Sequence, residues 1–213
     1  MVDTSKSKKI AVLSREGLTR FFLWISVIAW GILLGGKLFD LIVLVGAWSA
    51  SPPDSLNLLP YGLRYPVDTG DYFIPSSAIL LLATMGALIS GWKTPAQYRI
   101  LLMLSATMIF TTLVFTVVAF WPRNAALWAI AQNAPNSIKE VDAILVLVRQ
   151  WVVFDWFRII MGIIGYVSAI RAISIPYPPI IEVSNPSLGI KILYGICIGI
   201  VILFIIYFVQ GLL

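Results

Sequence analysis

Residues 21–48 have the sequence FFLWISVIAWGILLGGKLFDLIVLVGAW, in which the only charged residues are Lys37 and Asp40. A helix needs about 20 predominantly apolar residues to cross the hydrocarbon core of a bilayer, which is about 30 Å thick. This run is long enough, and it must be helical because lipid offers the backbone no hydrogen-bond partner. The sequence therefore predicts a transmembrane helix here.

The same kind of apolar run recurs along the chain. Of the 213 residues, 60% are hydrophobic and 12% are charged, whereas soluble domains are about 45–50% apolar and about 25% charged. Tryptophans lie at or near several ends of the runs, as expected for rings at the headgroup level. The predicted spans are Phe21–Trp48, Ile74–Trp92, Ile100–Trp121, Trp151–Ile173 and Leu188–Val209. They predict an all-α, polytopic transmembrane helical bundle with a four-helix core and a fifth, C-terminal span.

The domain organisation follows from these spans. Residues 1–20 form a basic N-terminus, 21–173 the four-helix membrane bundle with outer loops 49–73 and 122–150, and 174–213 a linker and the fifth helix. Nine Lys and Arg residues fall in the inner segments and four in the outer ones. This asymmetry predicts a cytoplasmic N-terminus. With no cleavable targeting peptide evident, it also favours a bacterial inner (plasma) membrane.

The two outer loops have different predicted structures. Residues 49–73 are too rich in proline for a helix and are expected to fold over the helix ends. Ser137–Glu140 match a capping box, which predicts a helix that starts there and continues into the fourth span. Asn124–Asn133 could form a short interfacial helix carrying Trp128.

Composition excludes several classes of site. The chain has no histidine and one cysteine, Cys197, so it cannot form an internal disulfide or a histidine-ligated haem, copper or zinc site. The basic residues do not gather with aromatic residues on one face, which argues against nucleic-acid binding. We expect no cofactor and no metal.

Four ionisable residues fall inside predicted spans: Lys37 and Asp40 in the first, and Asp155 and Arg158 in the fourth. At a rise of about 1.5 Å per residue, both pairs lie about 20–28 Å from the inner ends of their helices. The i, i+3 spacing puts each pair on one helix face. We therefore predict an electroneutral network in the outer third of the bundle, with Lys37 paired to Asp155 and Asp40 to Arg158.

Two interpretations of this network remain open. It could only fix helix register, or it could form a polar pocket, open to the outer side, that binds or transforms a small molecule. An ion or proton path is less favoured, because the acids do not continue as a chain across the membrane. Trp151, Asp155 and Arg158 have i, i+4, i+7 spacing and share one stripe of the fourth helix.

Three motifs resemble those of the anthrone oxygenase-like family of small integral membrane proteins. They are Gly35–Asp40 running on to Trp48 and Pro52-Pro53, Trp121–Leu127, and Trp151–Arg158. The similarity covers roughly residues 21–173. It implies a four-helix membrane bundle, and some fungal members are assigned to the oxygenation of anthrones to anthraquinones. The resemblance places these residues in or opposite the polar pocket: Asn124, Trp151, Asp155, Arg158, Lys37 and Asp40.

Two functions are therefore predicted. In the first, the protein is a cofactor-independent oxygenase of a phenolic or quinone-type substrate; Asp155 or Asp40 takes the phenolic proton, and Arg158 or Lys37 holds the anion. Asn124 and Trp151 are the candidate substrate-binding residues. In the second, the protein is a non-catalytic subunit of a larger membrane complex, or a homo-oligomer, with the fifth helix as docking surface. A transporter ranks last, because broken helices and repeats are not evident.

Overall fold

The computed structural model describes residues 4–60, 68–133 and 138–178. Every regular element in these ranges is helical. Among the described residues, four helical stretches are long and apolar enough to cross a membrane: Arg15–Trp48, Thr69–Ser90, Ala96–Gln132 and Glu140–Ser174. The predicted class, a helical membrane protein, is confirmed. The predicted fifth span, Leu188–Val209, lies outside the described residues.

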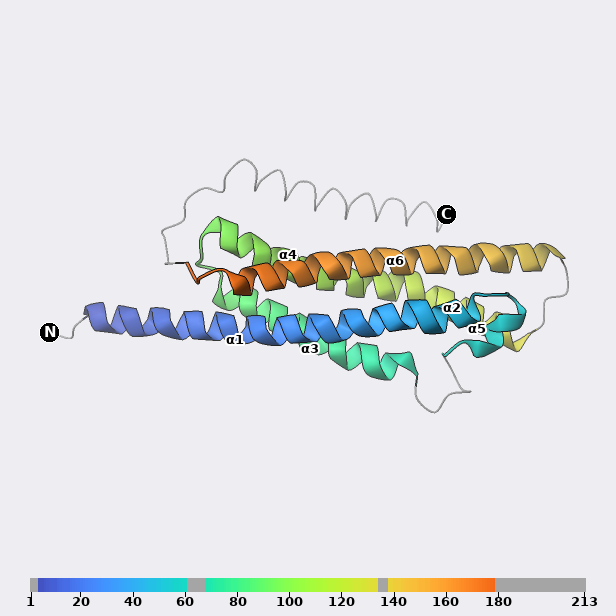
Figure 1. Ribbon diagram of the computed structural model, residues 1–213, viewed down its shortest axis with the longest axis horizontal. Helices are drawn as coiled ribbons and strands as arrows, with labels where there is room; N and C mark the ends of the chain where they lie inside the picture. The colour runs from blue at the N-terminus through green and yellow to red at the C-terminus, as the bar shows by residue number, and fades with distance from the viewer. Residues whose placement is uncertain (1–3, 61–67, 134–137, 179–213) are drawn as a thin grey trace.

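The helices alternate in direction along one long axis (Figure 1). In chain order the elements are α1 (Thr4–Phe39), η1 (Asp40–Val45), α2 (Gly46–Trp48), η2 (Asp54–Leu58), α3 (Thr69–Ser90), α4 (Ala96–Phe115), η3 (Thr116–Phe120), α5 (Trp121–Gln132) and α6 (Ile138–Ser174). Helix α1 packs against α3 and α6, and α4 also packs against α3 and α6. The result is a bundle in which α1 and α6 are antiparallel neighbours.

Helix α3 begins at Thr69, earlier than the predicted start at Ile74. The cause is a capping box: the Asp68 carboxylate accepts the N–H of Gly70, and the Asp71 carboxylate accepts the N–H of Asp68 at 3.0 Å. Capping satisfies backbone donors that would otherwise have no partner at a helix start. The expectation that residues 49–73 contain no helix was therefore wrong at its C-terminal end, and η2 is a second short exception.

The third span is also longer than predicted. Helices α4 and α5 are joined through η3 without a break, so the predicted short helix from Asn124 is the continuation of the span itself. The predicted helix start near Ile138 is confirmed, while Ser137 lies outside the described residues. At the other end of the chain, α1 extends back to Thr4 and makes most of the basic N-terminal segment helical.

Two segments inside the spans are π-helical, η1 in the first and η3 in the third. Such segments are rare, and they occur frequently at functional sites because the extra residue per turn re-aims side chains. Asp40 is the first residue of η1 and Thr116 the first residue of η3. One π-helical segment therefore begins at a member of the charge network described below, Asp40, and the other at Thr116, which contacts that network.

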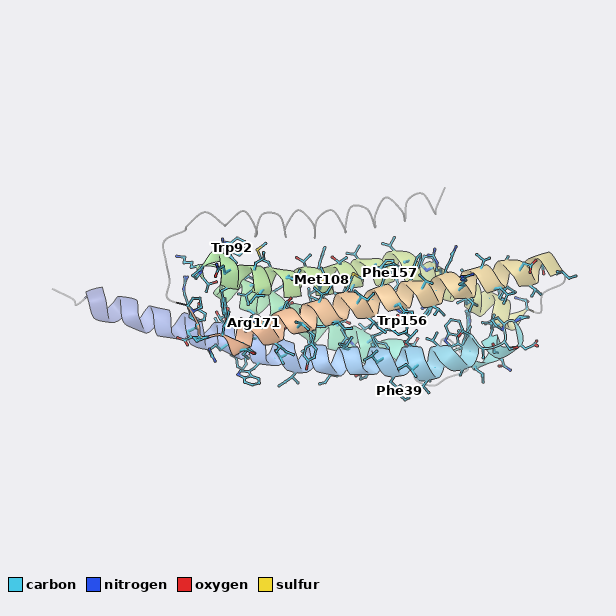
Figure 2. The ribbon with its side chains drawn as sticks, turned by 45° about the horizontal axis from the view of Figure 1, so that its top comes forward. Phe39, Trp92, Met108, Trp156, Phe157 and Arg171 are labelled. Carbon is cyan, nitrogen blue, oxygen red and sulfur yellow. The ribbon has the colours of Figure 1, made fainter. Side chains whose placement is uncertain are left out.

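The surface of the bundle is apolar along most of its length. Figure 2 shows Phe39, Trp156 and Phe157 projecting outward, and their exposed fractions are 58%, 50% and 45%. The core is apolar too, with occasional paired polar groups such as the Trp30 indole, which donates to Ser105 Oγ at 2.9 Å. A molecule that is apolar both inside and outside is what a lipid environment requires.

The contact of α6 with α1 depends on a glycine. A Cβ added at Gly165 would clash with the Trp30 ring, closest at Cζ2 and 2.9 Å from Cη2. Trp30 is 1% exposed and hydrogen-bonded to Ser105, so it has little room to move. We expect Gly165→Ala to lower the free energy of unfolding by about 1–3 kcal/mol through overpacking. Thermal or denaturant unfolding in detergent measures this loss.

Gly35→Ala is the matched control. A Cβ at Gly35 would meet nothing within 4 Å, and we expect no loss of stability there. Equal stability of the two variants would contradict the packing of Gly165 against Trp30.

Candidate functional site

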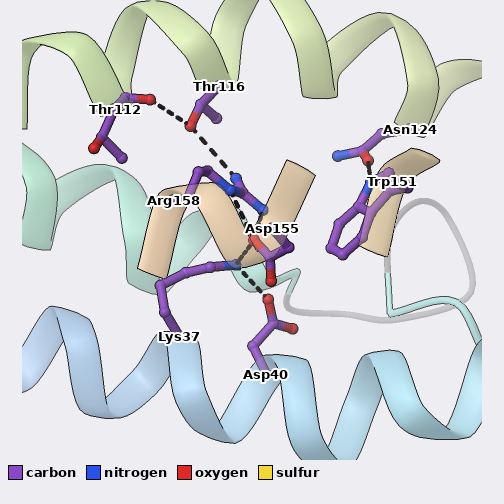
Figure 3. A network of polar contacts seen from close by, with 8 residues as sticks. All are labelled: Lys37, Asp40, Thr112, Thr116, Asn124, Trp151, Asp155 and Arg158. Carbon is purple, nitrogen blue, oxygen red and sulfur yellow. Dashed lines mark hydrogen bonds and ion pairs between the residues drawn. The ribbon is translucent and has the colours of Figure 1, made fainter. Parts of the chain in front are cut away.

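The four intramembrane charges meet between α1 and α6 (Figure 3). Lys37 Nζ lies 2.6 Å from Asp40 Oδ2 and 3.3 Å from Asp155 Oδ1. Arg158 donates to the same Asp155 oxygen from Nε, at 2.7 Å, and from Nη2. The groups form a chain in the order Asp40, Lys37, Asp155, Arg158, which we call the charge network. It joins two helices that are far apart in the sequence.

The predicted pairing of Lys37 with Asp155 is confirmed, and the predicted pairing of Asp40 with Arg158 is wrong. On each helix the i, i+3 spacing already brings acid and base of the same helix together, and neighbours at this spacing lie on one face. Lys37 then reaches across to Asp155, so a single lysine makes the bridge between the helices.

The network is almost completely buried. The exposed side-chain fractions are 0% for Asp155, 2% for Asp40, 9% for Arg158 and 14% for Lys37. Isolated charges in such a place would cost several kcal/mol each. Two acids and two bases in mutual contact give a net charge of zero, which explains how the bundle tolerates them.

Aromatic rings cover both cations. The Arg158 guanidinium lies 3.3 Å from the centroid of Phe120 and 5.6 Å from that of Trp151, and Lys37 Nζ lies 4.7 Å from the centroid of Phe73. Rings at these distances attract a cation through their quadrupole. Arg158 Nη1 also donates to Thr116 Oγ1 at 3.4 Å. The cations are thus held by ring faces as well as by carboxylates.

Asn124 and Trp151, the predicted substrate-binding residues, lie next to each other. The Trp151 indole donates to Asn124 Oδ1 at 2.7 Å. Trp151 also packs edge-to-face against Trp48 and Phe120, with centroid distances of 5.1 and 5.0 Å. The structure therefore brings Asn124 and Trp151 together beside the charge network (Figure 3), and their role in binding stays a prediction.

Several buried polar atoms have no hydrogen-bond partner among the described residues. Those at or beside the charge network are Asp40 Oδ1, Asp155 Oδ2, Trp48 Nε1 and Thr112 Oγ1. A buried polar atom without a partner costs about 1–3 kcal/mol, and such atoms are uncommon in folded proteins. Each of the two acids thus keeps one carboxylate oxygen free to accept a hydrogen bond from a donor that the described residues do not supply.

Sequence reasoning missed four contributors to the site: Thr116, Phe120, Phe73 and Trp48. Thr116 and Phe120 lie inside a run of apolar residues, where nothing local distinguishes them. Their depth in the bundle could have been predicted, because both fall near the predicted outer end of the third span, where the charges of the first and fourth spans were expected. Phe73 was assigned to a loop because the start of α3 was predicted too late.

A metal ion is another group that a cluster of buried acids could bind. Within residues 4–60, 68–133 and 138–178, no group of three or more His, Cys, Asp or Glu side chains could hold a metal ion. The charge network itself places Lys37 between its two acids.

The fold and the site together define a helical membrane protein with an electroneutral, buried polar site between its first and last described spans. A family model described as anthrone oxygenase matches residues 64–168. This match confirms the family resemblance predicted from the sequence motifs. The matched region contains Asp155, Arg158, Asn124 and Trp151, but it does not reach Lys37 and Asp40. Searches of curated proteins and of solved structures found no significant match.

Proposed function

We propose that the protein binds a phenolic or quinone-type small molecule at the charge network and oxidises it without a resident cofactor. The observation that carries this proposal is the pair of buried carboxylate oxygens, Asp40 Oδ1 and Asp155 Oδ2, that lack a donor beside a lysine and an arginine. The family match supports the reaction class.

A phenol has the chemistry that these groups would recognise. Its hydroxyl donates a hydrogen bond, as a free carboxylate oxygen requires, and its ring is compatible with the aromatic side chains Trp48, Phe120 and Trp151. When the hydroxyl loses its proton, the anion is stabilised by the nearby cation, and this attraction is much stronger in a buried site than in water.

The oxidation then uses dioxygen, with the ionised substrate as the electron source. For an anthrone, the ring methylene loses two hydrogen atoms and gains one oxygen atom as a carbonyl. The second atom of dioxygen leaves as water with those two hydrogens. The protein's own part is to bind the substrate, accept its proton and hold the anion.

We also propose the membrane and the orientation. The excess of Lys and Arg in the segments predicted to be inner supports a cytoplasmic N-terminus, and a bacterial inner membrane fits this pattern. We expect that an impermeant thiol reagent, added to intact spheroplasts, labels the variant protein that carries Asp54→Cys in a Cys197→Ser background. Labelling of inverted vesicles alone would contradict this orientation.

Oxygen consumption tests the function. Purified protein in detergent, given an anthrone or a hydroquinone, should consume dioxygen above the uncatalysed rate. Arg158→Lys keeps a positive charge but loses the forked contact with Asp155 and the stacking on Phe120. We expect it to lower the rate by about 10²-fold, the size typical of losing an oriented electrostatic group.

Arg171→Lys is the matched control, because Arg171 lies on the same helix and is exposed; its rate should equal that of the natural protein. Isolation only as a stoichiometric subunit of a complex, with no oxygen consumption by the chain alone, would contradict the proposal and favour the accessory-subunit alternative.

A further inference from the structure

We propose that Asp40 is the residue that takes the phenolic proton, while Asp155 stays ionised between two cations. This inference rests on the proposed function and goes beyond it, because it assigns a role to the first residue of η1, which the family match does not reach. Four observations support it: the free oxygen of Asp40, the two cations that contact Asp155, the charge balance, and the start of η1 at Asp40.

Asp40 is the less restrained of the two acids. Its side chain is 2% exposed; among the described residues, Oδ2 forms an ion pair with Lys37 and Oδ1 takes no hydrogen bond. A hydroxyl bound at Oδ1 would therefore meet a carboxylate with one lysine as its single cationic partner. Both acids are buried and have a free acceptor oxygen, but Asp40 has one cationic partner where Asp155 has two, so Asp40 is the easier of the two to protonate.

Asp155 is held more firmly. Its Oδ1 contacts Lys37 and accepts two N–H groups of Arg158. A guanidinium does not lose its proton in a protein. Protonation of Asp155 would leave Arg158 buried beside a neutral acid, which is strongly unfavourable. Protonation of Asp40 leaves Asp155 in place between Lys37 and Arg158, so the ion pairing of α6 is preserved.

The charge balance favours the same assignment. The four groups sum to zero before the reaction. In the proposed step the phenol O–H bond breaks, an O–H bond forms at Asp40 Oδ1, and the electron pair stays on the phenolic oxygen. The remaining groups Lys37, Asp155 and Arg158 then sum to +1 and face a ligand of charge −1. No charge enters or leaves the buried site, so the step avoids the cost of burying a net charge.

The surroundings of Asp40 can be followed in Figure 3. The charged groups that face it are Lys37 on its own helix, at 2.6 Å, and Asp155 and Arg158 from α6, which connect to it through Lys37. From α3 the nearest contribution is the Phe73 ring over Lys37, and from η3 it is Thr116, the partner of Arg158. Asp40 is also the first residue of the π-helical segment η1, a kind of segment that occurs frequently at functional sites.

The binding of phenol between about pH 6 and 9 tests the inference, because a simple phenol, like the tyrosine side chain, ionises only near pH ~10. The natural protein should take up neutral phenol and keep the proton on Asp40. Its affinity should therefore stay constant within about twofold, and calorimetry in two buffers should detect no proton release.

Asp40→Asn gives a site of charge +1 that binds phenolate from solution. Its affinity should rise about tenfold per pH unit, with release of about one proton.

Asp142→Asn, a change at an exposed acid of α6, is the control and should behave like the natural protein. A constant affinity in Asp40→Asn, or a rising one in the natural protein, would overturn the assignment to Asp40. If Asp155→Asn alone shows the rising affinity, Asp155 is the acceptor instead. Failure of every protein to bind phenol would refute the proposed function itself, which is a different result.

Infrared difference spectra of the natural protein give a readout that needs no variant to fold. Phenol binding should produce the carbonyl band of a protonated carboxylic acid. Absence of this band in a protein that binds phenol would overturn the inference.

Discussion

Replacing Arg158 by alanine is expected to lower the free energy of unfolding by about 3–5 kcal/mol, the cost of breaking a buried ion pair from one side. The structure explains the size of this effect. Asp155 is fully buried and would lose two hydrogen bonds, keeping only Lys37 at 3.3 Å. The guanidinium also covers the Phe120 ring, so its removal takes away one of the groups that pack against this ring. Chemical unfolding in detergent, followed by circular dichroism, measures the loss.

Arg171→Ala is the control for this change, because Arg171 is exposed at the far end of the same helix (Figure 2). We expect its effect to stay within about 0.5 kcal/mol, as for most surface substitutions. A second variant, Arg158→Ala with Asp155→Ala, removes both charges and should be more stable than Arg158→Ala alone. If Arg158→Ala unfolds like the natural protein, Asp155 is not buried beside Arg158.

The membrane-spanning helices were predictable because their signal is local. The run from Phe21 to Trp48 is decided by length and apolarity alone, and the structure confirms it within residues 15–48. The helix start at Ile138 was predictable for the same reason, because the capping-box pattern spans only four residues directly before an apolar run. The start of α3 was missed because Asp68 and Asp71 lie inside a proline-rich stretch, which outweighed a capping pattern that uses aspartate at both positions.

The site was predictable in outline and not in detail. Spacing along two antiparallel helices sufficed to bring Lys37 and Asp155 to one level, and they are in contact. The partner of Asp40 could not be derived in this way, because the choice between Lys37 and Arg158 depends on helix rotation, and η1 changes that rotation within the span. The π-helical segments themselves have no signature in a single apolar sequence, so Thr116 and Phe120 could not be assigned to the site.

Replacing Lys37 by methionine should be as damaging as the loss of Arg158, about 3–5 kcal/mol, because it leaves Asp40 with no cation and Asp155 with one. Adding Asp40→Asn to Lys37→Met should restore much of this loss. The double variant keeps Asp155 paired with Arg158 and returns the site to a net charge of zero. We expect a coupling energy of about 1–3 kcal/mol between positions 37 and 40, measured by a double-mutant cycle.

Activity separates the structural role of the pair from its chemical role. Since the double variant regains stability but lacks both the proton acceptor and the lysine, it should fold and still fail to consume oxygen. Lys93→Met, at an exposed lysine between α3 and α4, controls for the loss of a positive charge and should change neither quantity. A double variant that is both stable and fully active would show that Lys37 and Asp40 only hold α1 against α6, and the chemistry would then have to lie with Asp155 and Arg158 alone.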